Sequence, residues 1–397
     1  MTRLSLIALS MALTGPALAQ PVEQGPKNVP EFEPAWPTQT RAPAQDSGVT
    51  LDVQTVADGL SHPWGIEVLP DGGYLVTERP GRLRVIEPDG TLRDAPVDGV
   101  PEVMSQGQGG LLDVKLAEDF AESGLIFLSY AKPMDGGESA TAMARGILND
   151  DRTALTDVRD IFVQEPAYAN DKHFGSRIVT HDGNLFITTG ERSDLATRER
   201  AQDYDKTYGK VVRVTPTGSA LPDNPFVTVE DAIDTIWTLG HRNVQGADMR
   251  PGTDELWTLE HGPKGGDELN LIQKGANYGW PVVSYGQRYS GEPIGSGEPR
   301  LPQFREPQYY WDPVIAPGGF QFYEGDLFEG WNGDVIASSL RPGGIRRLVL
   351  DGDRIVGEEK FLEDRGRIRD VEIDSDDSIL LLTDYDDGAV LRVTPQR

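Results

Sequence analysis

The sequence predicts an all-β protein, a six-bladed β-propeller with four-stranded antiparallel blades. The first observation behind this prediction is a recurring pattern of a short apolar run, a tight turn of the Asp-Gly type and a second apolar run, which is a strong hairpin signal. The second is that the pattern occurs six times, at intervals of roughly 50–70 residues that leave space for about four strands in each copy. The third is the abundance of glycine (45) and proline (29), which many tight turns require.

The copies differ in how clearly they show the pattern. Four clear copies span residues 65–78, 178–191, 248–260 and 371–384, and two looser copies span residues 112–131 and 320–339. A pair of β-sandwiches is the competing architecture, but two sandwiches would not repeat one motif six times. Few segments have a helical pattern, and we expect one short helical turn within Ser193–Asp205.

The chain of 397 residues begins with the features of a secretory signal peptide at residues 1–19. Arg3 provides a positive charge, residues 4–13 an apolar run too short to cross a membrane, and residues 17–19 (Ala-Leu-Ala) a cleavage site. Residues 20–48 are rich in Pro, Gln and Glu, which predicts a flexible leader. Residues 49–397 then form the propeller domain. We expect export to the periplasm and, because no later stretch is long enough, no membrane span.

The composition excludes several classes of partner and chemistry. Lys and Arg number 37 against 64 Asp and Glu, a net charge of −27 that repels nucleic acid and anionic lipid. Cysteine is absent, so disulfides, thiol catalysis and thiolate metal sites are excluded. Glycine-rich phosphate loops, the Gly-x-Ser-x-Gly nucleophile motif and histidine spacing suited to zinc are also missing.

The blade-joining loops of a propeller meet at one face of its central channel, so residues just before each innermost strand come together. The polar residues at these positions are Gln108, His173, Arg242, Asn243, Arg367 and Arg369. The loop of residues 309–317 precedes the fifth copy of the pattern, and Arg341 follows the second strand of that copy. This positional match predicts a composite site at the channel mouth.

One histidine among several arginines is informative. Neighbouring cations lower the pKa of an imidazole, so His173 is suited to accept a proton near pH 7. Arg367 and Arg369 face the same side of an extended segment, and such a cluster in an acidic protein calls for an anionic partner, such as a cofactor with several carboxylates. The alternatives are a structural role for His173 and a salt-bridge network between the arginines and neighbouring acids such as Asp370.

Residues 239–281 form a polar, glycine-rich stretch between strand-like runs. Arg242-Asn243 places a guanidinium beside an amide, which suits a planar ligand that carries carboxylates. Gly262-Pro263 offers backbone carbonyls beside several acids, which suits a cation such as Ca²⁺. The alternative is an ordinary surface loop rich in turn residues.

At these residues the sequence resembles the soluble quinoprotein sugar dehydrogenases that depend on pyrroloquinoline quinone (PQQ). Within this family, the sequence is more similar to the periplasmic aldose sugar dehydrogenases than to the soluble glucose dehydrogenases. The resemblance covers the mature chain and rests mainly on residues 107–112, 172–177, 239–246, 260–281 and 367–371. It implies a six-bladed propeller with PQQ over the channel mouth.

The resemblance also implies a role for individual residues. His173 matches the catalytic base. The implied cofactor contacts are Gln108, Arg242, Asn243, Tyr289, Asp312, Pro313, Val314, Arg341, Pro342, Gly343, Arg367 and Arg369. Gly262 and Pro263 match carbonyl ligands of the Ca²⁺ that activates PQQ, and Glu268 and Tyr278 match ligands of a second, structural Ca²⁺.

The implied reaction is oxidation of the C1 hydroxyl of an aldose to an aldonolactone by hydride transfer to PQQ. Electrons would then pass to a periplasmic acceptor, a quinone or a cytochrome. Three positions depart from the glucose enzymes of the family: Lys172 replaces an Asp, Arg341 replaces a Lys, and residues 312–314 replace a segment with Trp and Thr.

Two other functions compete with this one. A Ca²⁺-dependent propeller lactonase would use carboxylate and Asn side chains on the metal, and the arginine cluster argues against it. A non-catalytic binding propeller would explain the fold and the acidity, but not the convergence of one histidine, several arginines and a cation loop. The sequence leaves open the physiological sugar and whether the protein is a monomer or a homodimer.

Overall fold

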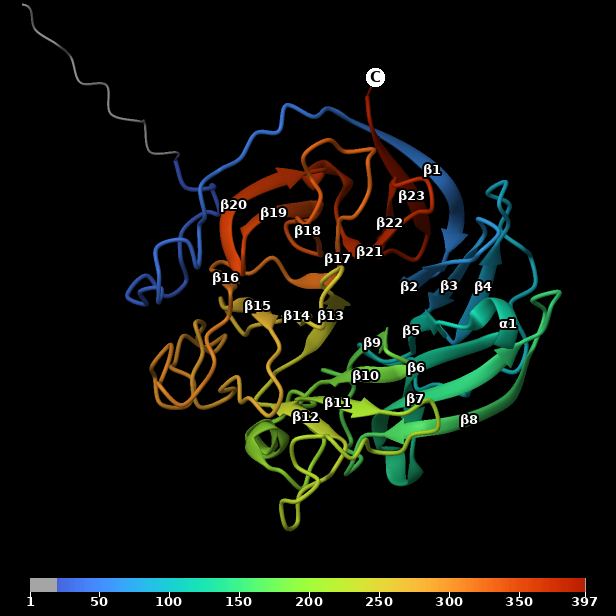
Figure 1. The fold of residues 1–397 in the computed structure, drawn as a ribbon. Helices are drawn as coiled ribbons and strands as arrows, with labels where there is room; N and C mark the ends of the chain where they lie inside the picture. Colours follow the sequence, from blue (N-terminus) through green and yellow to red (C-terminus); the bar gives the residue numbers. More distant parts are fainter. Residues whose placement is uncertain (1–19, 397) are drawn as a thin grey trace, which may run out of the picture.

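The computed structural model describes residues 20–396, which form a ring of six β-sheets around a central channel (Figure 1). The predicted six-bladed β-propeller is thereby confirmed. All six copies of the hairpin pattern form the first two strands of a blade. The expected signal peptide, residues 1–19, lies outside the described residues.

Five of the blades are four-stranded antiparallel sheets, and the first blade has three strands. Blade 1 consists of β2 (Pro63–Val68), β3 (Tyr74–Glu78) and β4 (Arg82–Ile86). Blade 2 consists of β5 (Leu111–Leu116), β6 (Leu125–Pro133), β7 (Ser139–Leu148) and β8 (Leu155–Val163), and blade 3 of β9 (Gly175–His181), β10 (Asn184–Thr189), β11 (Lys210–Val214) and β12 (Ile236–Leu239). Blade 4 consists of β13 (Val244–Met249), β14 (Leu256–Glu260), β15 (Asp267–Leu271) and β16 (Tyr309–Trp311), and blade 5 of β17 (Pro317–Phe322), β18 (Val335–Ser339), β19 (Ile345–Asp351) and β20 (Arg354–Phe361). Blade 6 consists of β21 (Ile368–Ile373), β22 (Ile379–Thr383), β23 (Gly388–Pro395) and β1 (Leu51–Leu60).

The expectation of four strands in every blade is wrong for blade 1. The chain after β4 runs along the free edge of that strand, where the amides of Arg93 and Val97 donate to the carbonyls of Val85 (3.0 Å) and Leu83 (2.8 Å). Pro96 lies between these two contacts and has no amide hydrogen, so a regular ladder cannot continue through it.

The innermost strands β2, β5, β9, β13, β17 and β21 line the channel. Each contacts the innermost strand of the next blade, and β21 contacts β2, so the ring closes. Closure also uses the chain ends: β1, near the N-terminus, pairs antiparallel with β23, with Leu51 opposite Pro395 (Figure 1). A closed ring leaves few free strand edges.

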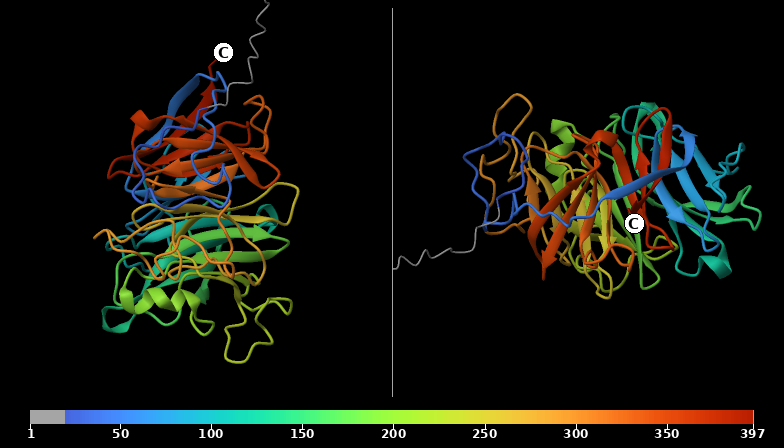
Figure 2. Two further views of the ribbon diagram at one scale, coloured as in Figure 1. Left: turned by 90° about the vertical axis from the view of Figure 1, so that its left-hand side faces the viewer. Right: turned by 90° about the horizontal axis from the view of Figure 1, so that it is seen from above.

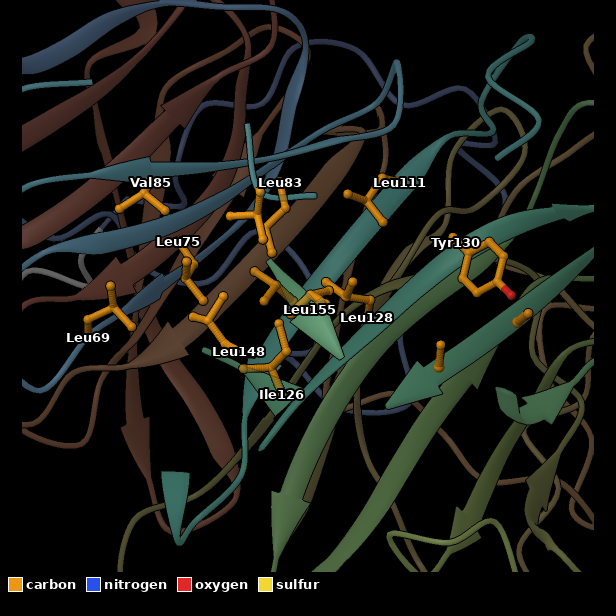
Figure 3. Close-up of a cluster of buried hydrophobic side chains, with 14 residues drawn as sticks. Leu69, Leu75, Leu83, Val85, Leu111, Ile126, Leu128, Tyr130, Leu148 and Leu155 are labelled. Atoms are coloured by element: carbon orange, nitrogen blue, oxygen red, sulfur yellow. The ribbon is translucent and has the colours of Figure 1, made fainter. Parts of the chain in front are cut away.

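Apolar side chains pack between adjacent blades. In the cluster between blades 1 and 2, Leu75 and Leu83 of blade 1 are grouped with Ile126 and Leu128 of blade 2 (Figure 3), and all four are at most 2% exposed. Burying each such side chain contributes about 1.5–3 kcal/mol. The blades are therefore held in a fixed relation, which keeps the loops at the channel mouth in register.

Helices are few and short. They are α1 (Phe120–Ser123) and α2 (Leu195–Arg198), together with the 3-10 helices η1 (Asp135–Gly137), η2 (Glu199–Gln202) and η3 (Glu363–Arg365). The predicted helical turn within residues 193–205 is confirmed by α2 and η2. Within residues 20–396 no helix has both the length and the apolar character needed to cross a membrane.

Residues 20–48, which we name the N-terminal strap, are not the flexible leader that their composition predicts. Val22 (4% exposed) and Ala42 (0%) are buried, and the amide of Tyr310 in β16 donates to the carbonyl of Gln39 (2.9 Å). The strap also forms a bridge to β20, so it lies along the outer strands of blades 4 and 5 (Figures 1 and 2). The overall composition of the strap does not reveal that Val22 and Ala42 are buried.

Candidate active site

The loops that lead into the innermost strands bring the predicted polar residues together. His173 lies two residues before β9, Arg242 and Asn243 directly precede β13, and Arg367 directly precedes β21. Two contacts join loops of different blades: the amide of His173 donates to Gln108 Oε1 (2.8 Å) and that of Gly175 to Asn243 Oδ1 (3.0 Å). The expectation that these residues occupy equivalent places in different blades is confirmed.

His173 is a buried side chain with a defined tautomer. Its Nδ1 lies 3.1 Å from Glu191 Oε2, and the residue is 6% exposed. Since an ionised carboxylate only accepts, Nδ1 carries the proton and Nε2 is the nitrogen that can accept one. The backbone of His173 is in the left-handed region, with φ of 51°, a costly conformation that tends to persist at functional sites.

Charges around this pair keep the imidazole neutral and the carboxylate ionised. Burial lowers the pKa of His173 below its ordinary value of 6.5, Arg242 lowers it further, and Glu191 partly opposes both. Burial raises the pKa of Glu191, but the interactions with His173 and Arg242 outweigh it, so the net shift is downward. His173 is therefore a proton acceptor at neutral pH.

Gln108 and Asn243 hold the backbone around His173 rather than project as free side chains. Their side-chain oxygens accept from the amides of His173 and Gly175, as described above. Gly190 packs against the same segment: a Cβ at this position would lie 2.1 Å from the carbonyl oxygen of His173. These contacts fix the loop that carries the imidazole.

Arg242 is a buried guanidinium with donors to spare. Its Nη1 donates to the carbonyl of His261 (2.9 Å), its backbone amide donates to Glu260 Oε2 (2.7 Å), and its guanidinium lies 5.3 Å from the centre of the Trp280 ring. Its Nε is buried without a hydrogen-bond partner within residues 20–396. An unsatisfied buried donor of this kind is costly unless a ligand accepts from it.

A second group of arginines surrounds a single carboxylate, Asp384. Arg369 Nη2 donates to Asp384 Oδ2 (2.8 Å), and Arg367 donates to the same oxygen. Burial raises the pKa of Asp384, but the two arginines outweigh it and hold the pKa well below its usual range. Arg79 lies nearby, with its pKa lowered by burial and by Arg369. The expected salt bridges do exist, but through Asp384 rather than Asp370, which pairs with Arg177.

The positive charge of this group exceeds its negative charge. Arg79, Arg367 and Arg369 lie around Asp384, and Arg369 Nε is buried without a hydrogen-bond partner in the described part of the chain. Arg369 Nη1 donates to Gln245 Oε1 (2.8 Å), which also faces His261 Nε2 (3.0 Å). The arrangement suits an anion with several carboxylates.

The predicted cation ligands lie around one small cavity next to Arg242. Its lining includes Gly262, Pro263, Glu260, Glu268 and Tyr278, and its free volume of about 10 Å³ is the size of one water molecule. Burial and the neighbouring Glu260 raise the pKa of Glu268 well above its ordinary value. Two carboxylates in one buried cavity are the arrangement that a cation stabilises.

Tyr278 can offer a cation only its backbone carbonyl. Its hydroxyl donates to the carbonyl of Leu271 (2.6 Å) and accepts from the amide of Gln273 (2.9 Å). Its ring stacks on His241, with 4.7 Å between the ring centres.

Asp312 does not present its side chain to the site. Oδ1 accepts from the amide (2.8 Å) and Nδ2 (2.7 Å) of Asn28, and Oδ2 accepts from the amide of Val29 (2.9 Å). The carboxylate thus faces the N-terminal strap, and the cofactor contact expected of the turn at 312–314 stays a prediction. Pro313 and Val314 are partly exposed and continue the same turn.

The remaining predicted contacts lie at the edge of the site. Arg341 and Pro342 are exposed, and the amide of Arg341 donates to the carbonyl of Ile315 (3.1 Å), which places it beside the turn at 312–314. Gly343 has φ of 119°, and a Cβ there would lie 2.3 Å from the carbonyl oxygen of Gly366. Tyr289 is 76% exposed, and its side chain makes no hydrogen bond within residues 20–396.

Sequence reasoning missed the acids that orient this site. An acidic residue stands at or just after the end of the second strand in four blades: Glu78, Glu191, Glu260 and Asp384. The last three accept from histidines that precede innermost strands, at 3.1 Å from His173, 2.9 Å from His241 and 3.1 Å from His62. The repeat itself contained this signal, because each clear copy of the hairpin pattern ends on an acid.

Comparison with known proteins agrees with this architecture. The chain matches the family described as Glucose / Sorbosone dehydrogenase over residues 60–392. It is 42% identical over 351 residues to the aldose sugar dehydrogenase YliI of Escherichia coli (strain K12), covering 87% of this chain and 94% of that protein.

Two solved structures are similar over most of their length. The apo-form of the soluble aldose sugar dehydrogenase from Escherichia coli has a TM-score of 0.84 at 41% identity and covers 87% of this chain and 100% of that one. The PQQ-bound aldose sugar dehydrogenase from Streptomyces coelicolor has a TM-score of 0.72 at 28% identity, with 89% and 99% covered. The chain therefore belongs to the glucose/sorbosone dehydrogenase family, as a quinoprotein sugar dehydrogenase of the aldose sugar dehydrogenase kind.

Proposed function

We propose that this protein oxidises the C1 hydroxyl of aldose sugars to aldonolactones, with His173 as the general base and with PQQ and Ca²⁺ as cofactors. The observation that carries the proposal is the neutral imidazole of His173, oriented by Glu191 (3.1 Å) and enclosed among arginines that have donors to spare. A base with a free acceptor nitrogen next to a cationic pocket suits removal of a hydroxyl proton beside an anionic redox cofactor.

The arginines support the choice of cofactor. PQQ is a planar quinone that carries three carboxylates, and the unpartnered buried Nε atoms of Arg242 and Arg369 are donors that such groups can satisfy. The solved relative from Streptomyces coelicolor is described as a PQQ-bound form. Arg367, Arg341 and the backbone near Gly343 would complete the anion-binding side.

The cavity beside Arg242 supports a bound cation. Gly262 and Pro263, which can offer backbone carbonyls, line it together with the two acids Glu260 and Glu268. Hard oxygen donors of this kind suit Ca²⁺, which accepts carbonyl and carboxylate ligands in flexible geometry. The same cavity also reaches Tyr278, so the ligand sets inferred for an activating and a structural cation lie close together.

When bound, PQQ supplies a two-electron acceptor, and Ca²⁺ supplies a Lewis acid beside it. The chain's own residues then have separate tasks. Nε2 of His173 takes the proton of the C1 hydroxyl, Glu191 holds Nδ1 and stabilises the imidazolium that forms, and Arg242 and Arg369 hold anionic groups in place. Gln108 and Asn243 keep the base loop from shifting.

The test of this proposal is a titration of the metal-free apo-protein with PQQ, followed by absorbance, with and without Ca²⁺. We expect saturable, stoichiometric binding that requires Ca²⁺, and aldose-dependent reduction of a dye only in the loaded protein. Absence of PQQ binding by folded protein in the presence of Ca²⁺ would contradict the proposal. So would aldose oxidation by protein that contains no quinone.

The pH dependence of kcat/KM is expected to show the titration of His173. The base must be neutral, so activity falls on the acid side as pH drops through its pKa, and the downward shift puts this midpoint below pH 6.5. Glu191→Gln removes the charge that raises this pKa, so the acid limb moves to still lower pH. The same change weakens the orientation of the ring, and we expect kcat to fall about 10- to 100-fold.

The measurement is a pair of pH–rate profiles with saturating PQQ and Ca²⁺. The matched control is Glu199→Gln, which neutralises an exposed carboxylate on η2 and should leave both the profile and kcat unchanged. An acid limb in Glu191→Gln at the same pH as in the wild type would show that Glu191 does not act through His173.

The N-terminal sequence supports a proposal for the location of the protein. We propose that residues 1–19 direct export and are removed, and that electrons leave to a quinone or cytochrome of the periplasm. Recovery of the protein in a periplasmic fraction with an N-terminus near Gln20 is the expected result. Retention of the full chain in the cytoplasm would contradict it.

A further inference from the structure

The N-terminal strap (residues 20–48) makes its most concentrated polar contact with Asp312. This carboxylate is 2% exposed and accepts three hydrogen bonds from the strap, two from Asn28 (2.8 and 2.7 Å) and one from Val29 (2.9 Å). The carbonyl of Asp312 accepts a further bond from Arg41 Nη2 (2.8 Å). The strap therefore satisfies both the side chain and the backbone of the residue that begins the turn at 312–314.

The strap is also linked to the cation loop at 262–266. The carbonyl of Asn28 accepts from Gln287 Nε2 (3.0 Å). The backbone of Gln287 in turn pairs with Lys264 in both directions, its amide donating at 3.1 Å and its carbonyl accepting at 3.0 Å. A single side chain, that of Gln287, thus connects Asn28 to the cation loop.

The cation loop and the turn at 312–314 are coupled to each other. Asp267 Oδ1 accepts from the amide of Gly262 (2.7 Å), and its Oδ2 accepts from the amides of Ile315 (2.8 Å) and Ala316 (2.7 Å). Gly265 approaches Asp312 so closely that a Cβ on it would lie 2.7 Å from Asp312 Oδ1. A shift of Asp312 would therefore move the cation loop as well as the turn.

We infer that the N-terminal strap is a positioning element of the cofactor site, with Asn28 and Asp312 as the pair through which it acts. This inference rests on the proposed function, because it concerns how firmly the same site holds PQQ and Ca²⁺. The reason is physical: a buried carboxylate needs its donors. Three of the donors that keep Asp312 in place come from a segment far away in the sequence and outside the ring of blades. Supporting contacts of this kind hold ligands in binding geometry.

The decisive variant is Asn28→Asp, which sets one carboxylate against another where Nδ2 now donates at 2.7 Å. We expect the Kd for PQQ, measured at saturating Ca²⁺, to rise about 10- to 100-fold, with kcat of the fully loaded enzyme little changed. Asn28→Asp combined with Asp312→Asn removes one of the two facing charges and should recover part of the affinity. Asn28→Ala removes one donor without adding charge and should have a smaller effect in the same direction.

The matched control is Ser47→Asp. Ser47 belongs to the same strap, and its hydroxyl donates to a carboxylate of blade 5, Glu359 Oε1 (3.0 Å), away from the turn. The new charge repels a carboxylate just as in Asn28→Asp, so a general loosening of the strap would weaken PQQ binding in both variants. We expect the Kd of Ser47→Asp to equal that of the wild type.

A second readout does not depend on the cofactor. In the apo-protein, hydrogen exchange of the amides of Gly266, Ile315 and Ala316 should be faster in Asn28→Asp than in the wild type and unchanged in Ser47→Asp. If wild-type protein fails to bind PQQ, the proposed function fails, and this exchange measurement still decides the positioning role. The inference is overturned if folded Asn28→Asp and Asn28→Ala exchange these amides at the wild-type rate and, where PQQ binds, keep the wild-type Kd for PQQ. If Asn28→Asp does not fold, Asn28→Ala decides.

Discussion

His173→Gln is expected to lower turnover with aldoses by about 100- to 10,000-fold, the usual contribution of a positioned general base. Glutamine has a similar reach and can donate to Glu191 as Nδ1 of the imidazole does now (3.1 Å), so the loop should keep its conformation. It offers no basic nitrogen to take the hydroxyl proton. PQQ affinity should stay close to the wild-type value, because the arginines that hold anionic groups are unchanged.

The experiment compares kcat at saturating PQQ, Ca²⁺ and sugar with the Kd for PQQ from absorbance titration. His181→Gln is the matched control, since His181 lies at the end of β9 remote from the loops that carry the site, and it should retain full turnover. Turnover of His173→Gln near the wild-type value would remove His173 from the role of base. A joint loss of turnover and PQQ binding would instead mean that the loop has moved.

Removal of Ca²⁺ is expected to abolish aldose oxidation, with a loss of at least about 100-fold, because a Lewis acid contributes several kcal/mol to such a step. Gly262, Pro263, Glu260 and Glu268 line the cavity that would hold the ion. Ca²⁺ added back with PQQ should restore activity. Mg²⁺ should restore much less, because it requires tighter octahedral coordination and gives up its water reluctantly.

The measurement uses protein treated with EDTA, freed of chelator and checked for metal content. Glu268→Gln should require a higher Ca²⁺ concentration for half-maximal activity, since one of the two neighbouring carboxylates is lost. Glu298→Gln, a change in the exposed connection between β15 and β16 and outside the cavity lining, is the control and should behave as the wild type. Full activity of metal-free protein with PQQ would exclude an activating cation.

Local patterns were enough to predict the blades. A hairpin depends on residues close together in the chain, such as Asp71-Gly72 between β2 and β3, and six copies of it predicted the ring. Blade 1 was the exception, because Pro96 interrupts the position where a fourth strand would pair. The loops before the innermost strands were predictable for a related reason: in a closed ring, equivalent chain positions become neighbours in space.

Partners from distant segments were not predictable in this way. Glu191 was overlooked although it ends a copy of the repeat, because nothing in the local sequence pairs it with His173. Asp384 was likewise missed as the shared partner of the arginines in blade 6. The bond between Asp312 and Asn28, 284 positions away, was also not foreseen.

The sequence by itself thus determined the propeller, the convergence of a histidine with several arginines, and the loop of Gly262-Pro263 beside acids, because these depend on short-range periodicity and on residue chemistry. The tertiary structure alone decided which acid orients the base, which carboxylate balances the arginines, and that residues 20–48 form an ordered strap on blades 4 and 5. The physical reason is that a buried polar group must find its partner wherever the fold brings one within about 3 Å, and distance along the chain has no part in that choice.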